Sequence, residues 1–437
     1  MNRVCVIDIA ALSPRLATRV DGLWINSLPS RPRAMKPTLP AVAASVQASM
    51  TTGAAPGQHG VIGGGLFRRG RREVSLDERS NTLLAKKRFW HARRLGMPKT
   101  ALVFWTNPLA GAADFVLGAM TNGPSGVSLA DLPVGLYARL AAEIGPCDTA
   151  LLRGPGASWP AAGWIADAAA SIWREQKPQL AWVYMPGVDF EAVRHGVDSA
   201  HAAEALRVLD LQAHRLAEEV AAGGGRTVIV SDGGYVNVST VAFPNIRLHQ
   251  AGLLKTVQTD LGEMADLENS AAFAMVDHQI GYVYCADAAA VQAAGEALAG
   301  LNGVAQILRP SEALDCGIGC ERAGDIMLLA RPDAWLSYRW WPEDDRAPRA
   351  ADRWDVQGKL GHDPCELFAA PFGEEGRGQQ SDAGRIDPNP ARVRASRGLV
   401  PPDPADHAVL AATCEIDAPE DLKVTDLPRI VERLMLA

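Results

Sequence analysis

The fold of this chain is decided between two apolar runs, Leu180-Ala-Trp-Val-Tyr184 and Arg226-Thr-Val-Ile-Val-Ser231. Each run is short and apolar, which is typical of a buried strand. Between them, apolar residues recur at spacings of three and four, the period of an amphipathic helix: Leu206, Leu209, Ala213, Leu216 and Val220. Gly223-Gly224-Gly225 then ends the helix, because glycine readily adopts the left-handed conformation found at helix ends. The stretch therefore predicts a strand, a crossover helix and a second strand.

The same alternation of strands and helices extends over the N-terminal part of the chain. Val4–Ile9 and Ala101–Trp105 predict two more buried strands, so the sequence indicates an α/β fold with a mainly parallel sheet. In such sheets, ligands bind at the carboxyl ends of the strands. Asp189 follows the first quoted run, and Asp232 directly follows the second. We therefore expect the functional site at this edge of the sheet.

The character of the sequence changes from about Pro244 onwards. Ala271–Cys285 and Asp325–Ala330 predict strands of a smaller α+β unit, with a helix over Ala288–Leu298 between them. Two later segments are rich in charge, glycine and proline and predict loops or covers, namely Pro342–Asp352 and Phe372–Arg394.

These patterns predict how the domains are arranged. We expect a core domain over residues 1–243, an inserted cap domain over 244–390, and a return to the core over 391–437. Val424–Leu434 predicts a final helix in that returning tail.

Composition excludes several classes of protein. The chain has 437 residues, 48% of them hydrophobic, which is enough for a large core. Its net charge is −7 and it has no basic arm, so a nucleic-acid partner is not expected. No apolar stretch approaches the roughly 20 residues of a membrane helix, and Asp8 interrupts the first run too early for a signal peptide. Seven scattered cysteines suit a reducing compartment, so we predict a cytoplasmic protein without a membrane partner.

Four motifs follow one another in the order and spacing of a known family. They are Leu39-Pro40-Ala41-Val42-Ala43-Ala44-Ser45-Val46-Gln47-Ala48-Ser49-Met50-Thr51-Thr52-Gly53, Pro56-Gly57-Gln58-His59-Gly60, Val183-Tyr184-Met185-Pro186-Gly187-Val188-Asp189 and Val230-Ser231-Asp232-Gly233-Gly234. On these motifs the chain resembles the type I phosphodiesterase and nucleotide pyrophosphatase family of the alkaline phosphatase superfamily. The resemblance implies an alkaline-phosphatase-like fold with an inserted cap. It also implies hydrolysis of phosphoesters with two metal ions, usually zinc.

The resemblance assigns a role to each site position, and most of those positions have changed. The attacking Thr or Ser is replaced by Ala43, the first Asp ligand by Ala10, the phosphate-binding Asn by Gly64, and the three His ligands by Val193, Gly233 and Arg397. Asp189 and Asp232 are retained, and Asp8 lies two residues before Ala10, so the occupant of the first position stays open. Alanine cannot attack phosphorus, and a zinc site needs about four N, S or O ligands. Two-zinc hydrolysis is therefore not expected.

Arg397 suggests what replaces the metal. A guanidinium can hold a carboxylate or a phosphate with two hydrogen bonds, and either retained Asp could pair with it. His195 and His362 lie in segments expected to approach the same pocket. We therefore predict an organic-anion pocket in which the catalytic candidates are Asp189, Asp232 and His195, and the substrate-binding candidates are Arg397, His362 and Ser45.

Two functional hypotheses remain. In the first, the chain is a pseudoenzyme that keeps the phosphodiesterase fold and binds a small organic anion. In the second, it is an enzyme with repurposed, metal-independent acid–base or transfer chemistry on such an anion. Conventional metal-dependent hydrolysis ranks third, and a relic network of mutually satisfied groups is the alternative to any function at this site. No cofactor is predicted; the fallback is one divalent cation held by Asp8, Asp189 and Asp232.

Weaker signals are interpreted as structural. The Asp277-His278 pair lies in an apolar strand context and favours a hydrogen-bonded core histidine over a catalytic dyad. His59 matches a family position with a structural role. An aromatic cluster in the cap favours core packing over contact with a ligand: Trp335, Tyr338, Trp340 and Trp341.

Overall fold

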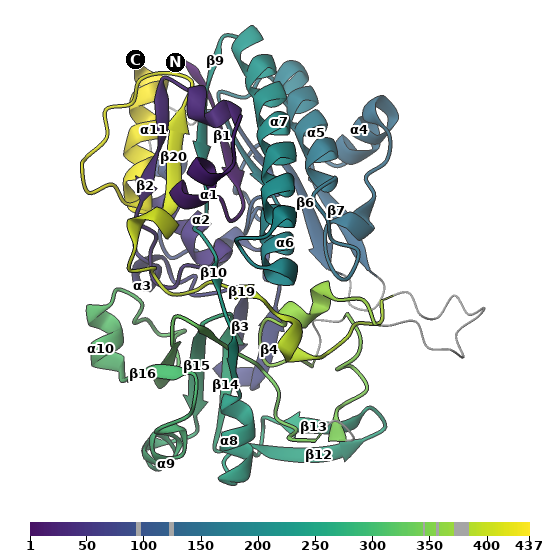
Figure 1. Ribbon diagram of the computed structural model, residues 1–437, viewed down its shortest axis with the longest axis vertical. Helices are drawn as coiled ribbons and strands as arrows, with labels where there is room; N and C mark the ends of the chain where they lie inside the picture. Colours follow the sequence, from purple (N-terminus) through teal and green to yellow (C-terminus); the bar gives the residue numbers. More distant parts are fainter. Residues whose placement is uncertain (93–97, 122–125, 344–345, 355–357, 371–383) are drawn as a thin grey trace, which may run out of the picture.

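The structure, a computed structural model, consists of two lobes (Figure 1). It describes residues 1–92, 98–121, 126–343, 346–354, 358–370 and 384–437. Parts of both predicted loop segments, residues 344–345 and 372–383, lie outside the described residues. The upper lobe is built on one large sheet and the lower lobe on smaller sheets, and both chain ends lie in the upper lobe.

The upper lobe confirms the predicted mainly parallel α/β fold. Its eight-stranded sheet has the order β2-β20-β9-β1-β8-β5-β6-β7. The strands are β1 (Arg3–Ile9), β2 (Ser30–Met35), β5 (Thr100–Val103), β6 (Phe115–Thr121), β7 (Val127–Leu132), β8 (Leu180–Met185), β9 (Gly225–Val230) and β20 (Ala408–Ala412). Neighbours from β9 to β6 run parallel, whereas β7 and β20 are antiparallel to the strands beside them.

The quoted stretch forms the predicted strand–helix–strand unit. The helix α7 (Ala200–Ala222) joins β8 to β9, and β1 lies between these two strands. Ser199 starts the helix by accepting a hydrogen bond from the Ala202 amide at 3.1 Å. All five residues of the predicted apolar stripe are buried against the sheet. The local periodicity therefore determined this part of the fold.

Helices cover both faces of the sheet. Cys5, Ile7 and Ile9 of β1 point to the face covered by α7 and α5 (Ala161–Gln176), whereas Val4 and Val6 point to the other face. That second face is covered by α2 (Ala43–Thr52) and α11 (Leu427–Leu436), the latter being the predicted final helix. Because side chains alternate along a strand, Asp8 shares the α2 face with Val4 and Val6.

The lower lobe has its own hydrophobic core, formed mainly by residues 242–360. Its antiparallel sheet has the order β14-β15-β17-β16, with strands β14 (Ala272–Asp277), β15 (Ile280–Cys285), β16 (Val304–Leu308) and β17 (Ile326–Ala330). The helix α9 spans Ala288–Leu298, as predicted. Ile62 and Phe67 also pack into this core, so a hairpin from the N-terminal part of the chain joins the lower lobe. Tyr338, Trp340 and Trp341 of the aromatic cluster are buried there as well, whereas Trp335 packs in the core of the upper lobe.

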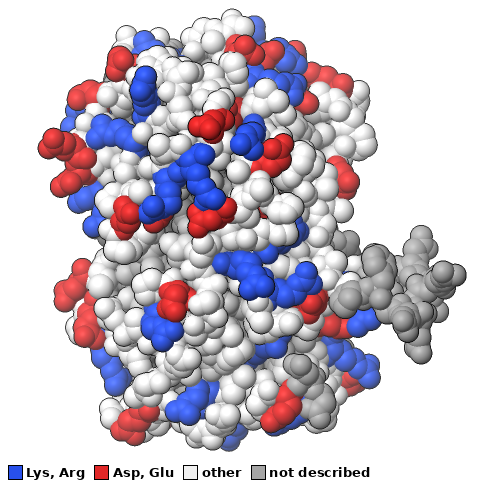
Figure 2. All heavy atoms as spheres, viewed as in Figure 1, with Lys and Arg blue, Asp and Glu red and all other residues white. Residues whose placement is uncertain are grey.

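The other helices and strands are shorter or lie at the edges. They are α1 (Pro14–Arg19), α3 (Pro56–His59), β3 (Gly65–Arg68), β4 (Glu73–Leu76), α4 (Leu136–Ile144), α6 (Val188–His195), β10 (Val236–Asn237), β11 (Thr240–Ala242), α8 (Pro244–Gln250), β12 (Lys255–Thr259), β13 (Gly262–Asp266), α10 (Pro310–Asp315), β18 (Ala334–Leu336) and β19 (Ala395–Ser396). No helix among the described residues is long and apolar enough to cross a bilayer. Acidic and basic side chains are interspersed over both lobes on the face in Figure 2.

Candidate functional site

A cavity of about 320 Å³ lies where the two lobes meet. Its upper wall contains residues from the carboxyl ends of β8 and β5 and from the first turns of α2 and α6, including Tyr184, Phe104, Ala43 and Asp189. Its lower wall contains the β14–β15 turn and the segment from residue 361 to 367. The cavity therefore lies at the sheet edge where the sequence predicts the site.

Arg397 lines this cavity and forms a buried ion pair. Its Nη1 donates a hydrogen bond to Asp232 Oδ2 at 2.6 Å, and both side chains are buried. The guanidinium lies 4.9 Å from the ring centroid of Tyr235. Burial opposes the charged form, but Asp232 and then Tyr235 hold the pKa of Arg397 well above its usual value. Nη2 has no hydrogen bond to a described residue, and Nε is buried without a partner among them, so Arg397, which lines the cavity, keeps unpaired donors.

Asp189 lies near Arg397 but does not bond to it. Its Oδ1 accepts a hydrogen bond from the Gly187 amide at 2.7 Å, at the start of α6. Burial raises the pKa of Asp189 to about 6. Of the two retained acids, only Asp232 pairs directly with Arg397.

Asp8 lies behind the cavity wall and faces α2. Its Oδ2 accepts a hydrogen bond from Gln47 Nε2 at 2.9 Å, and its Oδ1 has no partner among the described residues. Burial, followed by repulsion from Asp232, raises the pKa of Asp8 well above its usual value. With no cation beside it, a buried carboxyl in this state favours the protonated form.

The residues present do not fit a two-metal centre. Ala43 stands on the cavity wall where the resemblance places a nucleophile, and the Arg397 guanidinium is bonded to Asp232. Among the described residues, no group of three His, Cys, Asp or Glu at this edge brings its ligand atoms within 4.8 Å of one another. The fallback site on Asp8, Asp189 and Asp232 therefore lacks a converged set of donors.

An Asp–His pair that was expected to lie in the core lines the lower wall. His278 Nδ1 lies 2.7 Å from Asp277 Oδ1, and Asp277 Oδ2 accepts a hydrogen bond from the Gly64 amide at 2.9 Å. The His278 ring stacks on His362 with centroids 4.1 Å apart. Burial lowers the pKa of both histidines, that of His362 to about 3, so both rings are neutral. None of the described residues bonds to His278 Nε2.

His278 is indeed buried and hydrogen-bonded, as predicted, but it also lines the cavity. It occupies the two-residue turn between β14 and β15, with a positive φ of 59°. The turn is held against the upper lobe because the Gln279 amide donates to the Arg397 carbonyl at 2.9 Å. The sequence analysis placed this pair in a strand context, whereas His278 lies in a turn, and only the packing of the two lobes shows where that turn points.

Three of the six predicted catalytic and substrate-binding residues do not line the cavity. Asp232 is fully buried and is joined to the lining through Arg397, and the other two lie elsewhere. His195 does not line the cavity: it ends α6, at the opposite end from Asp189, and stacks on His201. The expectation that its segment approaches the pocket is therefore wrong for this side chain. Ser45 is fully buried and also does not line the cavity. Two residues of α-helix rotate a side chain by roughly 200°, so Ser45 points away from the wall that Ala43 forms.

His59 has the structural role that the resemblance implies, and it makes stability depend on pH. Its Nε2 lies 2.9 Å from Ser49 Oγ, and its Nδ1 accepts a hydrogen bond from the Val61 amide at 3.1 Å. Burial lowers its pKa to about 4. Because the unfolded chain binds the proton at about pH 6.5, stability is full above that pH and is lost as the pH falls towards 4.

We expect His59 to account for about 3 kcal/mol of this loss. Urea unfolding at pH 7.5 and pH 4.5 measures it. A His59→Gln variant should be less stable at pH 7.5 but lose less on acidification than the wild type. Equal losses in both proteins would contradict the assignment.

The architecture defines an alkaline-phosphatase-like protein: a mainly parallel sheet lies between helices, and the cavity lies between this sheet and the second lobe. Residues 25–358 match the family model described as type I phosphodiesterase / nucleotide pyrophosphatase, and the chain belongs to that family. No curated protein matches the chain.

Solved structures show the same fold over the whole chain. Phosphonoacetate hydrolase from Sinorhizobium meliloti 1021, in complex with phosphonoformate, has a TM-score of 0.63 and 13% identity, covering 100% of this chain and 96% of that chain. Murine ectonucleotide pyrophosphatase/phosphodiesterase 5 has a TM-score of 0.62 and 11% identity, covering 99% and 95%. An inactive variant of the murine protein with AMP bound is similar to the same degree, at TM-score 0.62 and 11% identity, covering 100% and 95%. At these identities the likeness establishes the fold alone.

Proposed function

We propose that this chain is a family member that has lost two-metal hydrolysis and binds a small organic phosphate or phosphonate in its cavity. The observation that carries the proposal is the buried Arg397–Asp232 pair, at the position where the family has a metal ligand. Arg397 supplies one fixed positive charge, and its free Nη2 can donate to an anion oxygen. The guanidinium thus replaces the metal as the electrostatic partner of the ligand.

The rest of the cavity supports this function. Its volume of about 320 Å³ is within the range of small-molecule sites. Tyr184 and Tyr235 line it, and burial raises the pKa of both hydroxyls, so they remain neutral donors. The lining also includes acids, but Asp277 is already bonded to His278 and Gly64. Asp189, whose pKa is raised to about 6, accepts a proton readily when an anion binds beside it.

One similar structure supports binding without chemistry. The murine phosphodiesterase variant with AMP is described as inactive, and its change is the replacement of a threonine by alanine. The resemblance to the family places Ala43 at the nucleophile position. We propose that this chain, like that variant, binds a ligand without hydrolysing it.

We also propose that the protein is cytoplasmic. Its seven cysteines, all of them free, support this location.

Calorimetric titration of the full chain with AMP and with phosphonoacetate, both in the presence of a chelator, tests the proposal. We expect at least one of them to bind. Arg397→Lys keeps a cation beside Asp232 but removes Nη2, so it should weaken binding by about tenfold or more. The control is Arg392→Lys, an exposed arginine paired with Asp387, which should bind as the wild type does.

Three results would overturn the proposal. The first is that neither ligand binds, and the second is that Arg397→Lys binds as tightly as the wild type. The third is two equivalents of zinc in protein purified without chelator, together with turnover of a nitrophenyl phosphodiester. That result would show that the family's hydrolysis is retained with other ligands.

The Asp277–His278 pair favours a second candidate, a metal-independent acid–base enzyme acting on the same anion. Asp277 fixes the ring through Nδ1, which leaves the Nε2 lone pair to accept a proton from the ligand or from water. Phosphorus NMR of the titrated samples distinguishes the two functions. An unchanged ligand supports binding alone, whereas conversion without metal supports the enzyme.

A further inference from the structure

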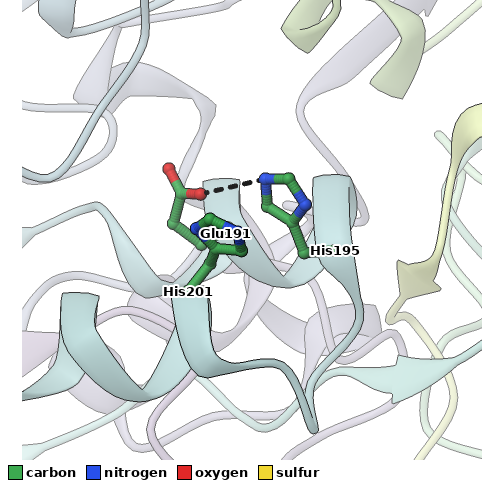
Figure 3. Close-up of side chains that lie close together, drawn as sticks. All are labelled: Glu191, His195 and His201. Carbon is green, nitrogen blue, oxygen red and sulfur yellow. Dashed lines mark ion pairs between the residues drawn. The ribbon is translucent and has the colours of Figure 1, made fainter.

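A second cluster of possible ligands lies outside the cavity, where α6 meets α7 (Figure 3). Its members are Glu191 and His195 on α6 and His201 in the first turn of α7, and their ligand atoms all lie within 4.8 Å of one another. Glu191 and His195 are four residues apart and therefore share one face of α6. Glu191 Oε2 lies 3.5 Å from His195 Nε2, and the two imidazole rings stack with centroids 4.0 Å apart.

The turn that brings the two helices together is well fixed. Gly196 permits it with a φ of 91°, and the Ser199 side chain caps α7. Asn237 ties the turn to the neighbouring segment: its Oδ1 accepts from the Val197 amide at 2.9 Å, and its Nδ2 donates to Asp198 Oδ2 at 2.9 Å. Ligands on rigid, hydrogen-bonded elements are preorganised, so little entropy is lost when a metal binds.

We propose that Glu191, His195 and His201 bind one divalent transition metal ion, for which Zn²⁺ is the expected ion. Two imidazoles and one carboxylate are a donor set that Zn²⁺ accepts, and three protein ligands leave a position open for water or a further ligand. No other group of three His, Cys, Asp or Glu among the described residues meets the same distance.

The surroundings of the cluster suit metal binding. Glu191 is buried, and its Oε1 accepts a hydrogen bond from Arg194 Nη1 at 3.2 Å, which orients the carboxylate and leaves Oε2 facing His195. The His195 side chain is 40% exposed and His201 is exposed, so an ion can enter from solvent.

This site is separate from the lost family centre. Asp189 starts α6 at the cavity, whereas His195 ends it on the other side. A bound metal would link α6 to α7, the long helix packed on the main sheet. Because Phe190 and Val193 of α6 line the cavity, the link would also stabilise one cavity wall.

Calorimetric titration with Zn²⁺ tests the proposal, using the full chain after a chelator has stripped its metal and has itself been removed. We expect one equivalent to bind, with binding weakened by about tenfold or more in each of His195→Ala, His201→Ala and Glu191→Gln. The matched control is His214→Ala: His214 lies on α7, 3.7 Å from Glu218, but is not part of a group of three ligands. It should bind Zn²⁺ as the wild type does. Co²⁺ binding should give a spectrum without thiolate charge-transfer absorption, because no cysteine takes part.

The proposal is overturned if the wild type binds no Zn²⁺ at a large excess of metal, or if the histidine variants bind it unchanged. A thiolate band in the Co²⁺ spectrum that survives His195→Ala would assign the metal to cysteines instead. Anion binding is measured in chelator, so neither result bears on the function proposed for the cavity.

Discussion

Arg397→Met is expected to destabilise the fold by about 3–5 kcal/mol, because it leaves Asp232 as a buried charge without its partner. Asp232 is fully buried, and its one other hydrogen bond to a described residue is a long one, 3.4 Å from the Ala11 amide. Asp8 lies close enough to be repelled by it. The substitution leaves Asp8 and Asp232 buried together without a cation. We therefore expect it to be among the most destabilising single substitutions in the chain. Urea unfolding at pH 7 measures the loss.

The double variant Asp232→Asn/Arg397→Met provides the control. It removes both charges and keeps the approximate volumes, so a large part of the lost stability should return. Full recovery would mean that the pair is retained for function rather than for stability. A single variant as stable as the wild type, or a double variant less stable than the single, would contradict the assigned ion pair.

Local patterns in the sequence predicted the elements of the fold well. The β8–α7–β9 unit and α9 follow from apolar periods that only a strand or a helix can bury. The hairpin of β3 and β4 was not assigned to the lower lobe, since its packing depends on contacts with residues about 200 positions later. Periodicity specifies which face of an element is buried but not the partner against which it packs.

The candidate site was predictable mainly at positions that the family motifs define, although His362, which stands at no such position, was also expected there and lines the cavity. Arg397 and Asp232 were found because each stands at such a position, and their ion pair follows from their chemistry. His278 was assigned to the core because nothing in its own sequence shows that the β14–β15 turn reaches the upper lobe. His195 was misplaced for a related reason: an alignment gives its position along α6 but not the side of the helix on which it lies.

Gly361 makes the closest backbone approach in the lower wall, and Gly361→Ala is the other substitution with a large expected effect. The segment around it pairs with β14: the His362 amide donates to the Val276 carbonyl at 2.9 Å, and the Val276 amide donates to the Leu360 carbonyl at 3.0 Å. A Cβ at position 361 would lie 2.0 Å from Val276 O and 2.6 Å from Val276 N. Its φ of 128° is also unfavourable for any residue with a side chain.

We expect Gly361→Ala to cost about 2–4 kcal/mol, from the backbone clash and the strained conformation together. Relief of the clash must move the segment away from β14, and with it His362, which stacks on His278 in the cavity wall. The same variant should therefore also bind AMP or phosphonoacetate more weakly. Gly252→Ala is the control, since Gly252 has a positive φ of 72° but no atom within 4 Å of the added Cβ. If Gly361→Ala unfolds at the same urea concentration as Gly252→Ala, the segment does not cross β14 as closely as described, and His362 is not held in the cavity wall by this contact.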